Sequence, residues 1–313
     1  MADEGRAPPA PRGRRGIWIA VAAFVAGFAL AAAEVTGGAP AVLLPAAAAV
    51  VAGLALLVSA RLRARRRQAG LRGPGDVEAH LGLATLGVVP VLPGQEPHRD
   101  AMGRERSPYA EAVRAVLEAA EATLPGRERP KVLLVTSSLP GEGKTTLALS
   151  LAALAARSGR VLVIDLDLRQ PNVHRKLGGE APVGIVEYVA GERALDEVIR
   201  HDAASGVDYL PVAERTTDPT ELVESERLRE LLIAARARYD HVVIDSAPVG
   251  LITDTRIVAR LADRVLYVAR WGQTPGSAVR DGLRQLREAG IEPAGVVLTQ
   301  APVEGADGRE PAP

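Results

Sequence analysis

The chain has 313 residues, enough for one large domain with additional segments. Its 38 basic and 38 acidic side chains balance, so its charge does not indicate a nucleic-acid-binding protein, and we expect no nucleic-acid partner. The absence of cysteine excludes disulfide frameworks, zinc–thiolate sites and thiol catalysis.

Two apolar runs stand near the N-terminus. Residues 1–16 are rich in Pro, Gly and Arg, and we predict that they are disordered. Residues 17–33 and 41–60 are apolar and approach or reach the ~20 residues that cross a bilayer. Arginines flank both outer ends, which places those ends in the cytoplasm by the positive-inside rule. The pattern predicts a transmembrane hairpin over 17–60 and a multi-pass protein of the bacterial inner membrane with a cytoplasmic catalytic domain.

Two other interpretations of these runs remain open. The first run could be a signal peptide cleaved near the alanines at 31–33. Both runs could instead be helices buried in a soluble domain, although the arginine clusters beside them argue against it.

Residues 61–130 are predicted to form a cytoplasmic connector. It contains a short helix near 76–83, an extended segment at 86–90 and a polar stretch at 93–108. Its last part, 109–124, has apolar residues at helical spacing and is predicted to be an amphipathic helix.

From 131 to 300 apolar strands alternate with helical segments, which predicts an α/β domain with a mainly parallel sheet flanked by helices. The predicted strands are 131–136, 160–165, 207–211, 241–245, 264–269 and 295–298. The predicted helices are 144–158, 185–190, 220–238, 254–261 and 276–289. Residues 301–313 are predicted to be a disordered tail.

A glycine-rich segment at 138–146 lies between the first of these strands and the first helix. This context is typical of a P-loop, in which backbone N–H groups and a helix N-terminus bind the phosphates of a nucleotide. Lys144 would reach the outer phosphates and the Thr145 hydroxyl would bind Mg²⁺. Ser138 stands where the strict pattern has Gly. The alternative is an ordinary turn before a core helix.

Carboxylates follow two later strands. Asp165, Asp167 and Arg169 stand at every second position after a run of four apolar residues, and Asp245 ends another buried strand. Ligands of parallel sheets bind beyond the carboxyl ends of the strands. One aspartate at a strand end is weak evidence, but two such strands after a P-loop predict a nucleotide and metal site. Asp254 begins a helix and is interpreted as its N-cap.

These motifs, in this order, resemble those of the bacterial tyrosine kinases (BY-kinases) of capsule and exopolysaccharide synthesis. The resemblance extends from about residue 40 to 300 and also includes the segments 76–90, 111–114, 218–222 and 295–298. It implies a P-loop NTPase fold preceded by the last membrane segment of a polysaccharide co-polymerase.

The resemblance also implies roles for individual residues, with ATP and Mg²⁺ as cofactors. The implied catalytic residues are Lys144, Asp165, Asp167 and Asp245, and the implied metal ligands are Thr145, Asp165 and Asp245. The implied nucleotide-binding residues are Pro140, Gly141, Glu142, Gly143, Lys144, Thr145, Thr146 and Arg169.

The function implied is that of a membrane-anchored ATP-dependent tyrosine kinase that regulates capsule or exopolysaccharide polymerisation or export. Its partners would be a polysaccharide co-polymerase or polymerase and export proteins, and Glu111 and Arg114 could join copies of the chain. The chain departs from the family in three places: 301–313 has no tyrosine, Leu117 replaces an arginine of the assembly motif, and a short loop replaces the extracytoplasmic domain. The alternative is a non-kinase ATPase switch that controls assembly of a co-polymerase complex. A partitioning-type ATPase is disfavoured because the P-loop has no second lysine.

Overall fold

The computed structural model describes residues 70–92, 99, 107–123, 132–213, 218–250 and 254–303. These belong to one of two compact units, Arg67–Pro313; the other, Met1–Arg66, lies outside the described residues. The predicted disordered N-terminus and the transmembrane hairpin therefore lie outside the described residues, as does 304–313 of the predicted tail. Ala301, predicted as the start of that tail, is instead the last residue of β8.

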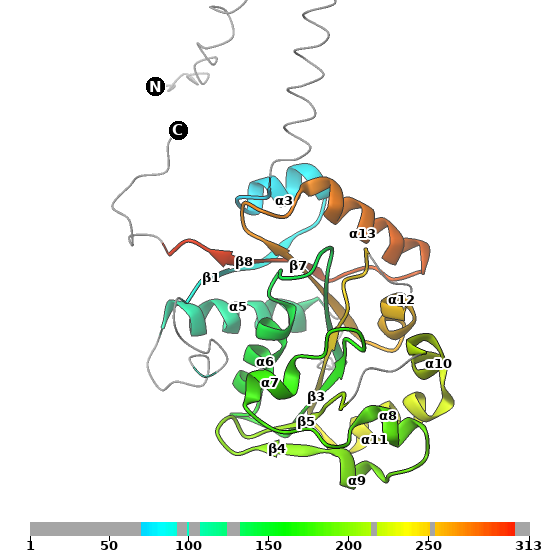
Figure 1. Cartoon of the computed structure of the whole chain (residues 1–313). Coiled ribbons are helices and arrows are strands. Elements are labelled where there is room, and N and C mark those ends of the chain that lie inside the picture. Colours follow the sequence, from blue (N-terminus) through cyan, green and yellow to red (C-terminus); the bar gives the residue numbers. More distant parts are fainter. Residues whose placement is uncertain are drawn as a thin grey trace, which may run out of the picture. The chain divides into compact units, whose positions relative to one another are not determined.

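An eight-stranded sheet forms the centre of the described unit (Figure 1). Its order is β1-β8-β7-β2-β6-β3-β5-β4, and every neighbouring pair is parallel except β4 and β5. The strands are β1 Thr85–Pro90, β2 Val132–Ser137, β3 Val161–Leu166, β4 Arg200–Asp202, β5 Val207–Leu210, β6 His241–Ser246, β7 Arg264–Arg270 and β8 Gly295–Ala301.

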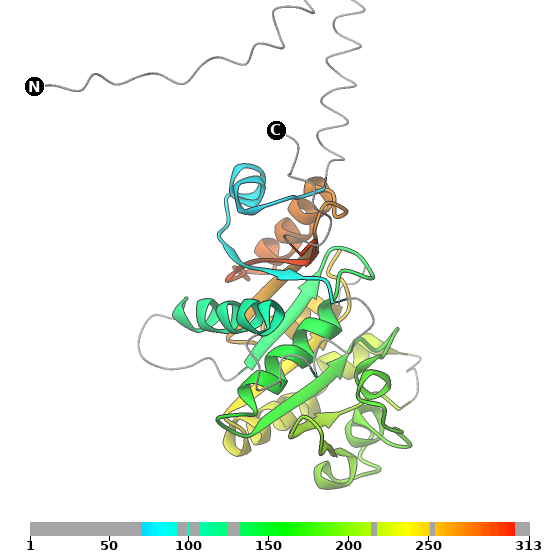
Figure 2. The same ribbon diagram turned by 90° about the vertical axis from the view of Figure 1, so that its left-hand side faces the viewer.

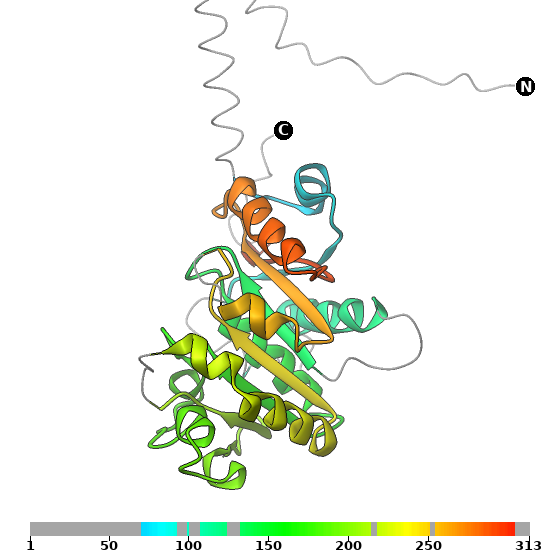
Figure 3. The ribbon, with the colours of Figure 1, turned by 90° about the vertical axis from the view of Figure 1, so that its right-hand side faces the viewer.

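Helices cover both faces of this sheet. The described helices are α3 Pro74–Leu81, α5 Pro108–Ala122, α6 Lys144–Ala155, α7 Val173–Leu177, α8 Ile185–Val189, α9 Leu195–Val198, α10 Pro219–Glu224, α11 Glu226–Arg238, α12 Asp254–Ala259 and α13 Gly276–Glu288. Helices α5 and α6 lie on one face, toward the viewer in Figure 2. Helices α11, α12 and α13 lie on the other, toward the viewer in Figure 3.

The alternation of side chains along the strands divides the core into two layers. On β6, Val242 and Ile244 belong to the layer under α11–α13, whereas Val243 belongs to the layer under α5 and α6. Strands with helices on both faces need apolar residues at every position, which explains the continuous apolar runs of the sequence. The predicted α/β fold with a mainly parallel sheet is confirmed.

Several elements differ from the sequence prediction. The segment predicted as extended at 86–90 is β1, which pairs with β8 and forms an edge of the main sheet. Helix α5 packs on it, and Gly87 permits this approach because a Cβ there would lie 2.5 Å from Cγ2 of Val116. The short elements β4, α7 and α9 were not predicted.

The helix predicted over 220–238 is two helices in the structure. Ser225 has an extended backbone (φ −61°, ψ 144°) and is the C-cap of α10 and the N-cap of α11. Its hydroxyl accepts a hydrogen bond from the amide of Leu228 and donates one to the carbonyl of Leu222. A serine side chain that bonds nearby backbone competes with helix continuation, which is the physical reason for the break.

The predicted multi-pass location in the inner membrane is contradicted. Within the described residues no helix combines the length and the apolar character needed to span a bilayer. Helix α6 is buried nearly all round, but its 12 residues extend only about 18 Å, and they pack against the sheet.

We expect Ser225→Ala to lower the free energy of unfolding by about 1 kcal/mol, because the first-turn amide of α11 loses its side-chain acceptor. Urea unfolding measures this. Ser225→Thr keeps the hydroxyl and is the matched control; equal stability of all three proteins would contradict the capping role.

Candidate functional site

The loop between β2 and α6 is shaped by two glycines with left-handed backbones. Gly141 has φ 79° and Gly143 has φ 88°, a region that side-chain-bearing residues rarely adopt. Gly143 is also the N-cap of α6. The turn leaves the first amides of α6, which have no acceptor within the helix, at the wall of a cavity. A helix N-terminus of this kind favours anions.

Thr274, which follows β7, and two residues of β8 form hydrogen bonds with this loop. The buried carboxylate of Glu142 accepts hydrogen bonds from the Leu139 amide and the Thr274 hydroxyl. The carbonyl of Glu142 accepts one from the Thr299 hydroxyl, and Gln300 donates from Nε2 to the carbonyl of Gly141 at 3.0 Å. Burial raises the pKa of Glu142, and its hydrogen bonds oppose the rise. Glu142 thus braces the loop and does not line the cavity.

Ser138, which departs from the strict P-loop pattern, has a partner in the structure. Its side chain is buried, and its hydroxyl is 2.9 Å from the Tyr267 hydroxyl on β7. A buried hydroxyl needs a hydrogen bond, and each of these two satisfies the other. The serine is therefore accommodated within the loop.

The two strand-end carboxylates meet because β3 and β6 are adjacent and parallel. Asp165 is directly opposite Asp245 in the register, and both are fully buried. The Asp165 carboxylate accepts hydrogen bonds from the amides of Asp167, Asn172 and Val173 at 3.0–3.1 Å. Burial raises its pKa well above the ordinary range, and the charge of Asp245 adds to the rise.

Asp245 differs from Asp165 in its partners. Within the described part of the chain, neither of its carboxylate oxygens receives a hydrogen bond of ordinary geometry. Burial raises the pKa of Asp245 to about 7, while the positive charge of Lys144 lowers it. A buried carboxylate with free oxygens beside a lysine is an arrangement that a cation would stabilise.

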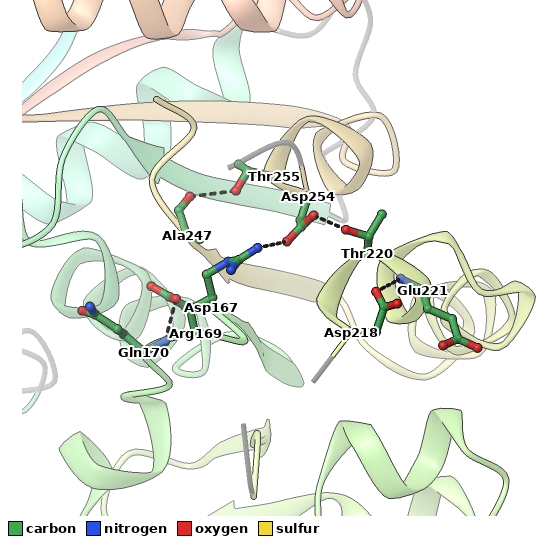
Figure 4. Close-up of polar contacts among 9 residues, drawn as sticks. All are labelled: Asp167, Arg169, Gln170, Asp218, Thr220, Glu221, Ala247, Asp254 and Thr255. Carbon is green, nitrogen blue, oxygen red and sulfur yellow. Dashed lines mark hydrogen bonds and ion pairs between the residues drawn. The ribbon is translucent and has the colours of Figure 1, made fainter. Parts of the chain in front are cut away.

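Asp167 and Arg169 follow β3 and line the cavity, whereas Asp165, which the spacing placed on the same side, does not. Burial raises the pKa of Asp167, and the amide of Gln170 donates to its carboxylate at 3.0 Å. Arg169 pairs with Asp254 at 3.3 Å (Figure 4). Asp254, expected to cap α12, also accepts a hydrogen bond from the Thr220 hydroxyl at 2.9 Å. This contact, not predicted from the sequence, connects the cavity to α10 and α12.

The P-loop and the segment after β3 border one cavity of about 840 Å³. The P-loop contributes Pro140, Gly141, Gly143, Lys144, Thr145 and Thr146, and the segment after β3 contributes Asp167, Arg169, Gln170, Asn172 and Lys176. Asp165 and Asp245 lie behind this lining. The sequence did not indicate that the ends of β1 and β8 also border the cavity, through Val91, Leu92, Thr299 and Gln300.

The comparisons with known proteins agree with this architecture. Residues 131–287 match a family described as AAA domain. The succinoglycan biosynthesis transport protein ExoP of Rhizobium meliloti is 33% identical over 72% of this chain and 29% of its own length. The tyrosine-protein kinase etk of Escherichia coli K12 is 29% identical over 79% of this chain and 37% of its own length. The solved kinase domain of the E. coli tyrosine kinase ETK is 27% identical with a TM-score of 0.70, over 78% of this chain and 100% of that domain.

The fold and the site therefore define a P-loop NTPase-like domain. The chain belongs to the AAA-domain family that it matches and is a P-loop ATPase of the bacterial tyrosine kinase family. It spans about a third of the length of the curated relatives that it matches.

Asp245 makes the stability of the metal-free and nucleotide-free protein depend on pH. Its pKa is about 7 when folded and 3.8 ordinarily, so between these values the folded state holds a proton that the unfolded state releases. Stability should thus fall as pH rises from about 4 to 7. At pH 8 Asp245→Asn should raise the free energy of unfolding, because the neutral amide removes a buried charge and its repulsion of Asp165.

Denaturant unfolding across this pH range measures the effect. Asp281→Asn, which changes an exposed carboxylate on α13, is the matched control and should leave the pH profile unchanged. A wild-type profile that rises toward pH 8, or one whose slope Asp245→Asn leaves unchanged, would contradict the burial argument.

Proposed function

We propose that this chain acts as an ATP-dependent protein-tyrosine kinase that regulates capsule or exopolysaccharide polymerisation or export. One observation carries the proposal: Lys144 of the P-loop lines a cavity beside the two buried carboxylates of Asp165 and Asp245. The names of the relatives, a tyrosine-protein kinase and a succinoglycan biosynthesis transport protein, support the reaction and the process.

ATP would bind with its phosphates in the loop from Pro140 to Thr146. The amides at the start of α6 would bind phosphate oxygens, and Lys144 would neutralise the charge of the outer phosphates. The braces from Thr274, Thr299 and Gln300 support this assignment, because a loop already held in place needs little reorganisation on binding.

Mg²⁺ fits the residues present. This ion is usually held by one or two protein side chains together with phosphates and water. The Thr145 hydroxyl lies at the cavity wall, and Asp245 has two oxygens that lack hydrogen bonds from the described protein atoms. Asp165, which lies behind the cavity lining, would act on the ion through its negative charge. When bound, Mg²⁺ would neutralise charge on the phosphates.

Asp167 and Arg169 would work on the acceptor side. Of the three strand-end aspartates, Asp167 alone lines the cavity, and its raised pKa suits a group that takes a proton from an acceptor hydroxyl. Arg169 would leave Asp254 to contact a phosphate, since its side chain is about half exposed and this ion pair is weak.

The proposed partners are a polysaccharide co-polymerase or polymerase and export proteins, together with further copies of the chain. Glu111 and Arg114 lie on the exposed face of α5 and pair with each other at 3.2 Å. An exposed pair of this kind contributes little to stability, so its charges are available for a neighbouring subunit.

A second candidate is a non-kinase ATPase switch. The contact from Arg169 through Asp254 to Thr220 favours it, because a phosphate that attracted Arg169 would loosen the connection to α10. The two candidates differ in the fate of the γ-phosphate, which either reaches a protein or is released to water.

We expect the protein with γ-labelled ATP and Mg²⁺ to yield phosphotyrosine on protein, and Lys144→Met to abolish it through loss of the phosphate-binding charge. Phosphoamino-acid analysis after incubation with candidate polysaccharide-assembly proteins measures this. Arg284→Met, on the exposed face of α13, is the control for loss of a cation. Lys144-dependent release of phosphate without any phosphoprotein would favour the switch instead.

A further inference from the structure

Strand β8 contains an extra residue at the point where it reaches the phosphate loop. Residues 88–90 of β1 lie opposite residues 298–301 of β8, so two steps along β1 correspond to three steps along β8. Such an insertion is a β-bulge, which leaves one residue unpaired and bends the strand that carries it. The bulge falls at Thr299 and Gln300, the two residues of β8 that line the cavity.

Regular alternation along β8 would send Thr299 and Gln300 to opposite faces of the sheet. Leu298 belongs to the core layer under α11–α13 and Val297 to the layer under α5 and α6, so Gln300 would follow Leu298 away from α6. The backbone of Gln300 is left-handed instead (φ 54°), and among the described residues no other side-chain-bearing residue has a positive φ. This conformation breaks the alternation and lets Gln300 reach the loop that precedes α6.

The side chains of Thr299 and Gln300 hold two successive peptide groups of the loop. Gln300 donates from Nε2 to the carbonyl of Gly141 at 3.0 Å, and the Thr299 hydroxyl donates to the carbonyl of Glu142. The described residues contain no cis peptide bond, and in a trans peptide the N–H points opposite to the carbonyl. The amides of Glu142 and Gly143 therefore point away from the two side chains that hold these carbonyls.

These two amides are available to an anion. Within the part of the chain that the structure describes, neither donates a hydrogen bond to the protein. Gly141 and Gly143 stand on either side of Glu142, and glycine adopts positive and negative φ with similar ease. Without the bonds from β8 these peptide groups could turn over, and each would then direct a carbonyl oxygen, which repels phosphate, where its amide had been.

We propose that the bulge of β8 makes Gln300 a positioning residue for the phosphates of the nucleotide, because it fixes the direction of the peptide group after Gly141. This rests on the proposed binding of ATP in the loop. Thr299 does the same for the next peptide group. Costly backbone conformations persist where the surrounding structure uses them, and they cluster at ligand-binding sites. The side chain of Gln300 is only half-buried, so packing in the core does not account for its conformation.

Two substitutions at Gln300 separate the hydrogen bond from the backbone strain. Gln300→Ala and Gln300→Gly both remove the donor to Gly141, but only glycine relieves the left-handed backbone. Calorimetric titration with ADP and Mg²⁺ should give a Kd about 3- to 10-fold higher for both variants, the effect of one lost hydrogen bond. In urea unfolding without nucleotide, Gln300→Gly should be more stable than Gln300→Ala. Equal weakening of binding by two variants of different stability is the result expected of a positioning residue.

Three further variants serve as controls. Gln273→Ala removes an exposed glutamine outside the cavity lining and should bind ADP as the parent chain does. Thr299→Val removes the donor to the Glu142 carbonyl and should weaken ADP binding, whereas Thr299→Ser keeps the hydroxyl and should restore it.

The outcomes distinguish this inference from the proposed function. Binding of ADP by the parent chain and equally well by both Gln300 variants would overturn the inference and leave the nucleotide site intact. Weaker binding by Gln300→Ala alone, in step with its lower stability, would show that Gln300 acts only on the fold and would also overturn the inference. A parent chain that binds no ADP in the presence of Mg²⁺ would overturn the proposed function and the inference together.

Discussion

Two carboxylates buried side by side at the end of a sheet are the constraint on which the site depends. Asp165 and Asp245 face each other because β3 and β6 are parallel and in register. Their burial disfavours the charged form, and their mutual repulsion adds to the cost. The two carboxylates have different partners: three amides donate hydrogen bonds to Asp165, whereas the charges of Lys144 and Lys176 and the Thr145 hydroxyl offset the burial of Asp245. A site left short of positive charge in this way is suited to a cation and its phosphate ligands.

The rigidity of the phosphate loop comes from strands at some distance in the sequence. Thr274 follows β7, and Thr299 and Gln300 belong to β8, yet all three bond to the loop after β2. Gln300 has a left-handed backbone (φ 54°), a costly conformation for a residue with a side chain. The same residue contacts the loop through its side chain. Strand order explains the arrangement, since β7 is hydrogen-bonded to both β2 and β8.

The sequence predicted what depends on local pattern and spacing. Continuous apolar runs predicted the parallel strands, and the spacing of glycines before Lys144 predicted the phosphate-binding loop. The contacts that needed a partner far along the chain were not predictable: Glu142 looks like a nucleotide-facing residue until Thr274 is known to lie beside it. Asp254 begins α12 as a cap would, but its carboxylate is used by Arg169 and Thr220 instead. The short strand β4 has too few residues to show a pattern.

The pairing of Ser138 with Tyr267 makes two positions, 129 residues apart in the sequence, dependent on each other. Gly282 of α13 joins them, because a Cβ there would lie 1.9 Å from the Tyr267 hydroxyl. Related chains should therefore vary these three positions together: a glycine at the first would leave the phenol unsatisfied and favour phenylalanine, and a side chain at the third would exclude the phenol altogether. A search for the strict P-loop pattern alone would therefore reject a chain in which Ser138 is accommodated by residues outside the loop.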